Sequence, residues 1–154
     1  MRTSSRTKSE ELPDLDELDQ KIVKLLQTNG RISIPELAKQ VNTSRPTAYA
    51  RFDRLVENGT ITGFSAEVNH EHLGLAVTAL LMINTDQTEW RRVADTIRSD
   101  QDIVWLGLST GNADFVALVR AHDLSHLRDV ILDRLLQTPG VTAIVTNIVL
   151  EEML

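Results

Sequence analysis

Hydroxyl and guanidinium side chains recur along the segment 44–58 at the spacing of one helix surface. Ser44 is a favourable helix cap, Pro46 suits the first turn, and Asn58-Gly59 is typical of a helix end. At about 100° per residue, one side of this helix is apolar and consists of Ala48, Phe52, Leu55 and Val56. The opposite side is small and basic, so it could approach base edges in the major groove of a duplex.

Five side chains of this helix are predicted to contact double-stranded DNA, and they are Ser44, Arg45, Thr47, Arg51 and Arg54. A threonine can hydrogen-bond a base and place its methyl group on thymine, whereas arginine grips phosphate or guanine. Ser44 and the free N–H groups at the helix start can also hold a phosphate. Taken alone, the segment is explained equally well as an ordinary amphipathic helix with a solvated charged face.

The neighbouring segments favour the DNA-binding interpretation. Apolar residues at helical spacing predict a first helix over 15–28. Ser33 and Glu36 have the spacing of a capping box and predict a short second helix, which breaks at Asn42. A loosely alternating strand is expected over 61–68. This order is typical of a winged helix-turn-helix, in which the third helix enters the major groove.

The second half of the chain has a different pattern. Apolar runs predict strands at 75–83, 103–108, 115–121 and 141–150, and amphipathic patterns predict helices at about 88–99 and 123–137. The order β-α-β-β-α-β is typical of a ferredoxin-like domain, whose helices cover one face of an antiparallel sheet. The fold class is therefore α+β. Because the second face of such a sheet would stay bare, we expect at least a homodimer.

The charge distribution separates the two halves. The formal net charge is −6, which by itself argues against a nucleic-acid partner. Residues 1–63 nevertheless carry ten Lys and Arg against nine Asp and Glu, whereas residues 64–154 carry six against thirteen. The nearly neutral first half could therefore dock on DNA while the acidic half stays away from phosphate.

Composition excludes several classes of protein. The chain has no cysteine, which removes disulfides, thiolate metal sites and cysteine nucleophiles. No apolar run reaches the roughly 20 residues that span a bilayer, and the basic residues 2, 6 and 8 are followed by polar residues instead of a signal sequence. We therefore expect a cytoplasmic protein with no membrane partner.

The first half resembles the leucine-responsive/asparagine-regulator (Lrp/AsnC) family, and the similarity extends over about 15–151. The residues that carry it are Leu15, Asp16, Asp19, Ile22, Leu26, Gln27, Asn29, Gly30, Arg31, Glu36, Leu37, Ala38, Ser44, Arg51, Arg54, Leu55, Gly59, Ile61, Gly63 and Phe64. The resemblance implies a bacterial or archaeal transcription regulator whose ferredoxin-like (RAM-type) second domain forms dimers that assemble into tetramers or octamers. It also implies that the strand at 61–68 belongs to the hinge between the two domains.

The same resemblance implies a small-molecule effector, often an amino acid, and no cofactor. The sequence from Thr110 to Phe115 is similar to the family's Gly-x-x-Asp turn beside the effector pocket. Its glycine would leave N–H groups free for a carboxylate and its aspartate could hold an ammonium group. The predicted effector-binding residues are Thr110, Gly111, Asp114, Thr146 and Asn147. A plain hairpin turn in which Asp114 stabilises its own backbone is the alternative.

These patterns predict a leader at 1–13, a helix-turn-helix domain at 14–60, a hinge and linker at 61–74, and an oligomerisation and effector domain at 75–154. The alternative function is a metabolite-binding assembly module whose helices dock protein instead of DNA. His122 and His126 could share a helix face, but no further ligand completes a metal site. No nucleophile and base stand at a recognisable catalytic spacing, so we expect no enzyme.

Overall fold

The computed structural model describes residues 12–86 and 88–152. The chain divides into two compact units, Met1–Glu67 and Val68–Leu154. This division falls inside the connector predicted at 61–74. The predicted leader lies largely outside the described residues, and its last two residues, Leu12 and Pro13, have no regular structure.

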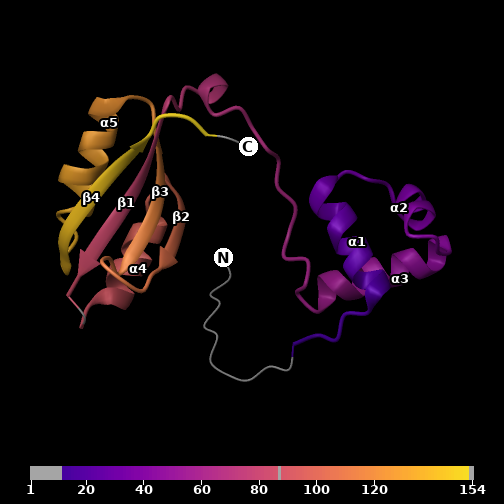
Figure 1. Ribbon diagram of the computed structural model, residues 1–154. Helices are drawn as coiled ribbons and strands as arrows, with labels where there is room; N and C mark the ends of the chain where they lie inside the picture. Colours follow the sequence, from indigo (N-terminus) through magenta and orange to yellow (C-terminus); the bar gives the residue numbers. More distant parts are fainter. Residues whose placement is uncertain (1–11, 87, 153–154) are drawn as a thin grey trace. The chain divides into compact units, whose positions relative to one another are not determined.

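The first unit contains three helices, α1 (Glu17–Thr28), α2 (Ile34–Gln40) and α3 (Arg45–Glu57) (Figure 1). Each begins at a residue whose side chain accepts a backbone N–H three residues on, and these caps are Asp16, Ser33 and Ser44. At α1 the capping box is reciprocal, because Asp19 also accepts the backbone N–H of Asp16. Asn42 takes the left-handed conformation (φ 56°), which allows the tight break between α2 and α3.

The core of this unit follows the predicted apolar faces. Its buried side chains come from all three helices, and they are Ile22, Leu26, Leu37, Val41 and Leu55. Ala48 is fully buried on α3, so a larger side chain there would push the helix away from the core. Val56 belongs to the apolar repeat of α3 but is 43% exposed. It is not among the residues that pack on the core of this unit.

The strand predicted at 61–68 does not form, since no strand lies between residues 12 and 76. A strand requires a hydrogen-bonding partner, and residues 12–67 of the first unit provide none. The segment is held instead by Phe64, whose ring stacks on Phe52 with 6.2 Å between centroids. Gly30 lies under the same ring, because a Cβ atom there would be 3.3 Å from Phe64. The unit is thus a helix-turn-helix without a wing strand.

The second unit is a four-stranded antiparallel sheet with helices on one face. Its elements are β1 (Val77–Thr85), α4 (Trp90–Ser99), β2 (Ile103–Leu108), β3 (Phe115–Ala121), α5 (Leu124–Asp129), a π-helical continuation (Val130–Leu135) and β4 (Val141–Val149). The strand order is β2-β3-β1-β4 (Figure 1), which confirms the ferredoxin-like plan. The segment 123–137 was predicted as one helix, whereas only its first part is α-helical.

The register of β1 separates the two faces of this sheet. Ala79, Leu81 and Ile83 are fully buried and pack with residues of α4, α5 and the π-helical turn. The alternate residues point to the opposite face, which no element of the unit covers. This open face carries exposed or half-buried apolar side chains, namely Leu80, Met82, Trp105, Val116, Leu118 and Val145.

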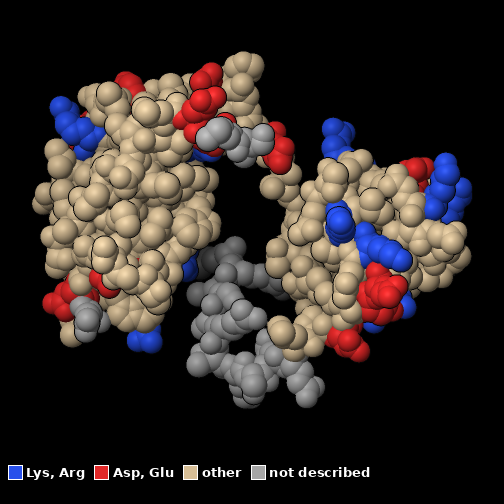
Figure 2. All heavy atoms as spheres, viewed as in Figure 1, with Lys and Arg blue, Asp and Glu red and all other residues tan. Residues whose placement is uncertain are grey.

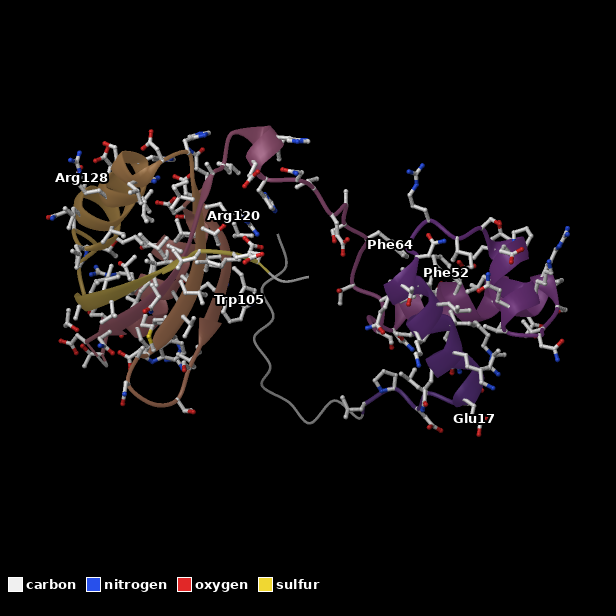
Figure 3. All side chains as sticks on the ribbon, turned by 45° about the horizontal axis from the view of Figure 1, so that its top comes forward. Glu17, Phe52, Phe64, Trp105, Arg120 and Arg128 are labelled. Atoms are coloured by element: carbon white, nitrogen blue, oxygen red, sulfur yellow. The ribbon has the colours of Figure 1, made fainter. Side chains whose placement is uncertain are left out.

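Trp105 (labelled in Figure 3) is 55% exposed on that open face. Its ring lies so close to Gly107 that a side chain at 107 would collide with it. Trp90 lies on the other face, where it packs against the core and Phe115. Within residues 12–86 and 88–152, none of the helices combines the length and the apolar character that crossing a bilayer requires.

Candidate nucleic-acid interface

The start of α3 is exposed and organised by its own side chains. The Ser44 Oγ atom accepts the Thr47 backbone N–H at 3.2 Å, and the two hydroxyl oxygens lie 2.7 Å apart. Arg45 follows the cap and is exposed to solvent. The structure therefore brings Ser44, Arg45 and Thr47 together at one helix end, where free N–H groups favour an anion.

A hollow of about 410 Å³ lies between α2 and this end of α3. Lys39 and Arg45 line it together with Ser33, the cap of α2. Glu36 also lines it, with its carboxylate accepting a hydrogen bond from Gln40 at 3.0 Å. Two cations beside two helix starts suit a phosphate group. Lys39 was not among the predicted residues, although its place one turn before the α2 break was visible in the sequence.

The two other predicted arginines lie against α1 instead of facing solvent freely. Arg51 donates to Asp19 Oδ1 at 3.1 Å and also pairs with Asp16, and Arg54 pairs with the second oxygen of Asp19. Asp19 is completely buried, whereas the side chains of Arg51 and Arg54 remain 29% and 47% exposed. We call this set, Asp16, Asp19, Arg51 and Arg54, the α1–α3 ion cluster.

The pairing between Asp16 and Arg51 shifts the pKa of each towards its charged form. The pKa of Asp16 is lowered from 3.8, first by the backbone N–H of Asp19 and then by the guanidinium of Arg51. The carboxylates of Asp16 and Asp19 raise the pKa of Arg51 in turn. Because the Asp16 pKa is lower in the folded state, its contribution to stability is complete above 3.8 and disappears as the pH falls through the lowered value.

The outer surface of α3 changes in character along the helix. Pro46, Tyr49 and Ala50 are exposed, and Tyr49 is 55% exposed. Farther along, Asp53 is also exposed and would face phosphate unfavourably. Figure 2 shows Lys and Arg side chains at several places on the visible surface of the first unit, some with acidic side chains beside them. Tyr49 was not among the predicted contacts.

The turn predicted to hold an effector is hydrogen-bonded to β1. Asp114 Oδ2 accepts hydrogen bonds from the Thr85 backbone N–H at 2.7 Å and from the Thr85 hydroxyl at 3.0 Å. Gly111 takes φ +130°, and both it and Thr110 are exposed. Asp114 therefore stabilises the end of the sheet through one carboxylate oxygen, and its other oxygen accepts no hydrogen bond from the described residues.

The remaining two predicted effector residues lie elsewhere on the sheet. Thr146 is paired with Leu81 and Asn147 with Leu80, so their side chains point to opposite faces. Asp114 is tied to Thr85, four positions farther along β1 than Leu81. Within a single chain, Thr146 and Asn147 therefore lie apart from the turn 110–114 along the sheet.

The histidine pair is occupied by hydrogen bonds. The rings of His122 and His126 stack with 5.2 Å between centroids, and His126 Nε2 lies 3.2 Å from a carboxylate oxygen of Asp102. His122 Nδ1 lies 2.8 Å from the carbonyl oxygen of Gly74. In the described part of the chain, His, Asp and Glu nowhere gather in a group of three that could hold a metal ion.

Family models match both units of the chain. The model of the AsnC-type helix-turn-helix domain matches residues 15–56, and that of the Lrp/AsnC ligand binding domain matches residues 78–154. The chain belongs to the Lrp/AsnC family. This Lrp/AsnC protein is accordingly a transcriptional regulator with a DNA-binding helix-turn-helix and a ligand-binding domain, as predicted. The match of the helical unit favours DNA over a docked protein as its target.

Relatives of this Lrp/AsnC chain extend over most of its length. An HTH-type transcriptional regulator of Pyrococcus horikoshii is 30% identical over 135 residues, covering 88% of this chain and 85% of the relative. The HTH-type transcriptional regulator FL11 of Pyrococcus abyssi is 32% identical over 137 residues, covering 89% of this chain and 90% of the relative.

Solved structures give the same result for the fold. Transcriptional regulator NMB0573 of Neisseria meningitidis, solved as an L-Met complex, has a TM-score of 0.86 at 25% identity and covers 91% of this chain and 92% of its own. AsnC of E. coli has a TM-score of 0.83 at 24% identity and covers 92% of this chain and 96% of its own.

Replacing Asp19 with alanine will loosen the first unit, because two guanidinium groups lose their buried counter-charge. We expect a loss of about 3 kcal/mol, the lower end for a buried pair, since both arginines reach water. Amide hydrogen exchange in α1 and α3 measures this opening directly. Glu17→Ala is the control, because its ion pair with Lys21 is exposed and contributes less than about 1 kcal/mol. Equal protection in the two variants would contradict a stabilising role for the cluster.

Proposed function

We propose that this regulator binds specific DNA sites as a homodimer or higher oligomer, through the first half of α3, and that an amino acid changes its assembly or its affinity for DNA. The observation that carries the DNA proposal is the exposed, basic start of α3 beside Lys39. A regulator acting on bacterial or archaeal chromosomal DNA works in the cytoplasm.

The arginines of α3 have two different roles in this proposal. Arg45 binds phosphate or a base edge, because it stands at the exposed helix end with Thr47 and Ser44. Arg51 and Arg54 set the orientation of α3 on α1, because both guanidinium groups are on Asp19. The exposed part of Arg54 remains available to a phosphate at the edge of the groove. Tyr49 adds an exposed aromatic contact.

Arg45→Ala will weaken binding to DNA from the region upstream of the protein's own gene. We expect about a tenfold loss at moderate salt and a salt slope reduced by about 1, because one phosphate contact is removed. Lys24→Ala is the matched control: Lys24 is an exposed cation on α1, away from the α2–α3 hollow. Affinities from fluorescence anisotropy over a salt series decide the matter. Identical slopes for the two variants would remove Arg45 from the interface.

The partner proposed for the open sheet face is a second copy of this chain. One face of the sheet is covered by helices, whereas the other presents Trp105, Leu80 and Val145 at 55%, 38% and 55% exposure. An apolar face of this kind is unstable in water alone, and a two-fold axis lets one surface match itself. Pairing would also place two α3 helices on half-sites, about one helical turn apart or a multiple of it.

Leu80→Lys will dissociate the oligomer into monomers, because the charge would be buried at the centre of the open face. Leu124→Lys is the matched control, since Leu124 is 59% exposed on α5, on the helix-covered side of the sheet. Sedimentation velocity at micromolar concentration measures the mass. We expect monomers only for Leu80→Lys. An unchanged mass for that variant would show that copies associate through another surface.

The proposed effector is an amino acid bound at the turn 110–114. Support comes from the ligand-binding family model over residues 78–154 and from the similarity to NMB0573, a protein solved with L-Met. The exposed N–H groups around Gly111 suit the carboxylate, and the Asp114 oxygen that accepts no bond suits the ammonium group. Because Thr146 and Asn147 lie apart from this turn, a neighbouring copy would have to complete the pocket.

Asp114→Ala will abolish the response of DNA binding to amino acids, with L-methionine as the first probe and the other natural amino acids as a panel. Thr85→Val separates the two roles of Asp114, because it removes one of the two hydrogen bonds from Thr85 to Asp114 and leaves the carboxylate in place. We expect Thr85→Val to keep the response. If both variants lost the amino-acid response, Asp114 would act only through its hydrogen bonds with Thr85, and the effector assignment would fail.

A further inference from the structure

A charged side chain is buried on the open face of the sheet, at the end of β1 opposite to the effector turn. Arg120 on β3 lies opposite Thr78 on β1, and each is only 9% exposed. Arg120 donates from Nη1 to the Thr78 hydroxyl at 2.9 Å. A buried guanidinium requires an anion to offset its desolvation, so the identity of that anion indicates what the site binds.

The anion comes from the segment that follows β4. Both Nη atoms of Arg120 donate to the Glu152 carboxylate, at 2.8 and 3.0 Å, and the Thr78 hydroxyl donates to it at 2.9 Å. This fork of parallel bonds is the strongest geometry between guanidinium and carboxylate. It lowers the pKa of Glu152 from 4.5, with Arg120 as the first cause and Thr78 as the second. Glu152 itself is 38% exposed and belongs to no helix or strand.

The site has more hydrogen-bonding capacity than Glu152 uses. Arg120 Nε and His70 Nδ1 are both buried, and neither has a hydrogen-bond partner among the described residues. His70 lies in the segment that precedes β1, and this ring nitrogen is enclosed. Both residues line a hollow of about 420 Å³ together with Thr78, Glu71 and Glu151. The Arg120 label in Figure 3 lies beside the yellow end of β4, where this hollow is found.

We propose that Arg120 and Thr78 form a binding site for a small free carboxylate, which Glu152 occupies as a built-in, displaceable competitor. Arg120 and Thr78 are fixed by neighbouring strands, whereas Glu152 stands on an irregular segment and leaves with little loss of structure. A ligand larger than a single carboxylate would reach His70 Nδ1 with a donor group. Glu71 and Glu151 on the lining disfavour a second negative charge.

The site differs in position and chemistry from the proposed effector turn. Arg120 is at the end of β3 that pairs with the start of β1, whereas Asp114 is bonded to the last residue of β1. Its principal group is a guanidinium and not a set of backbone N–H groups. The two sites can therefore be disabled separately, and failure of one leaves the other intact.

The test uses full-length protein and sodium propionate, which has the size of the glutamate side-chain end. Glu152→Ala removes the carboxylate that occupies the Arg120 site. The Arg120 Nε–H signal in the NMR spectrum then reports whether propionate is bound there. We expect a saturable shift in Glu152→Ala and an apparent affinity about tenfold weaker in the parent, because the tethered Glu152 competes at high effective concentration. In the parent, the Glu152 amide signal should move towards its free-chain position as propionate binds.

Matched variants and solutes define the alternatives. Sodium chloride at equal ionic strength and neutral propionamide should give no saturable shift. Asp95→Ala removes an exposed carboxylate on α4, outside the hollow, and should behave like the parent. Adding Thr78→Val to Glu152→Ala should weaken the affinity for propionate several-fold, because one hydrogen bond to the carboxylate is lost while Arg120 stays in place. The proposal is overturned if Glu152→Ala gives no saturable shift, or if chloride reproduces the shift.

Discussion

The first unit is organised around one buried carboxylate. Asp19 is excluded from solvent and satisfied by Arg51, Arg54 and the backbone N–H of Asp16 through the capping box. Removing both arginines from it would leave a buried charge uncompensated, at a free-energy cost of several kcal/mol. The orientation of α3 on α1 is therefore tied to these side chains. DNA contacts are consequently expected from the freer, N-terminal part of α3 and from Lys39.

The second unit depends on an unequal sheet. One face is packed against α4, α5 and the π-helical turn, and the other presents apolar side chains around Trp105 with Arg120 buried at one end. The open apolar part favours self-association, whereas Arg120 favours a carboxylate. The turn at Asp114 lies at the far end of β1. The proposed assembly surface, the proposed effector turn and the proposed Arg120 site thus involve different residues of one small sheet.

Periodicity predicted the elements well because it reports which side chains are buried. The strands at 103–108 and 115–121 have the predicted bounds, and all three helices of the first unit were anticipated. The strand at 61–68 failed because pairing depends on a partner that alternation cannot supply. Arg51 and Arg54 were predicted as DNA contacts, and their ion pairs with Asp19 were not foreseen. Asp19 is more than thirty residues away in the sequence, and hydrophobic periodicity does not report such a pairing. Strand alternation alone predicts that Thr146 and Asn147 point to opposite faces of the sheet. How far they lie from the turn 110–114 could be known only from the pairing register of β1 and β4.

The central claim is that α3 meets DNA with its first turns while its later arginines stay on α1. The most direct test is a crystal structure of the protein on DNA from its own upstream region, in which the guanidinium contacts are measured. We expect Arg51 and Arg54 to keep their ion pairs with the Asp19 carboxylate, as in the free protein, and Arg45 to lie within hydrogen-bond distance of a phosphate or base. Departure of both arginines from Asp19 to contact bases, with Arg45 left in solvent, would contradict it.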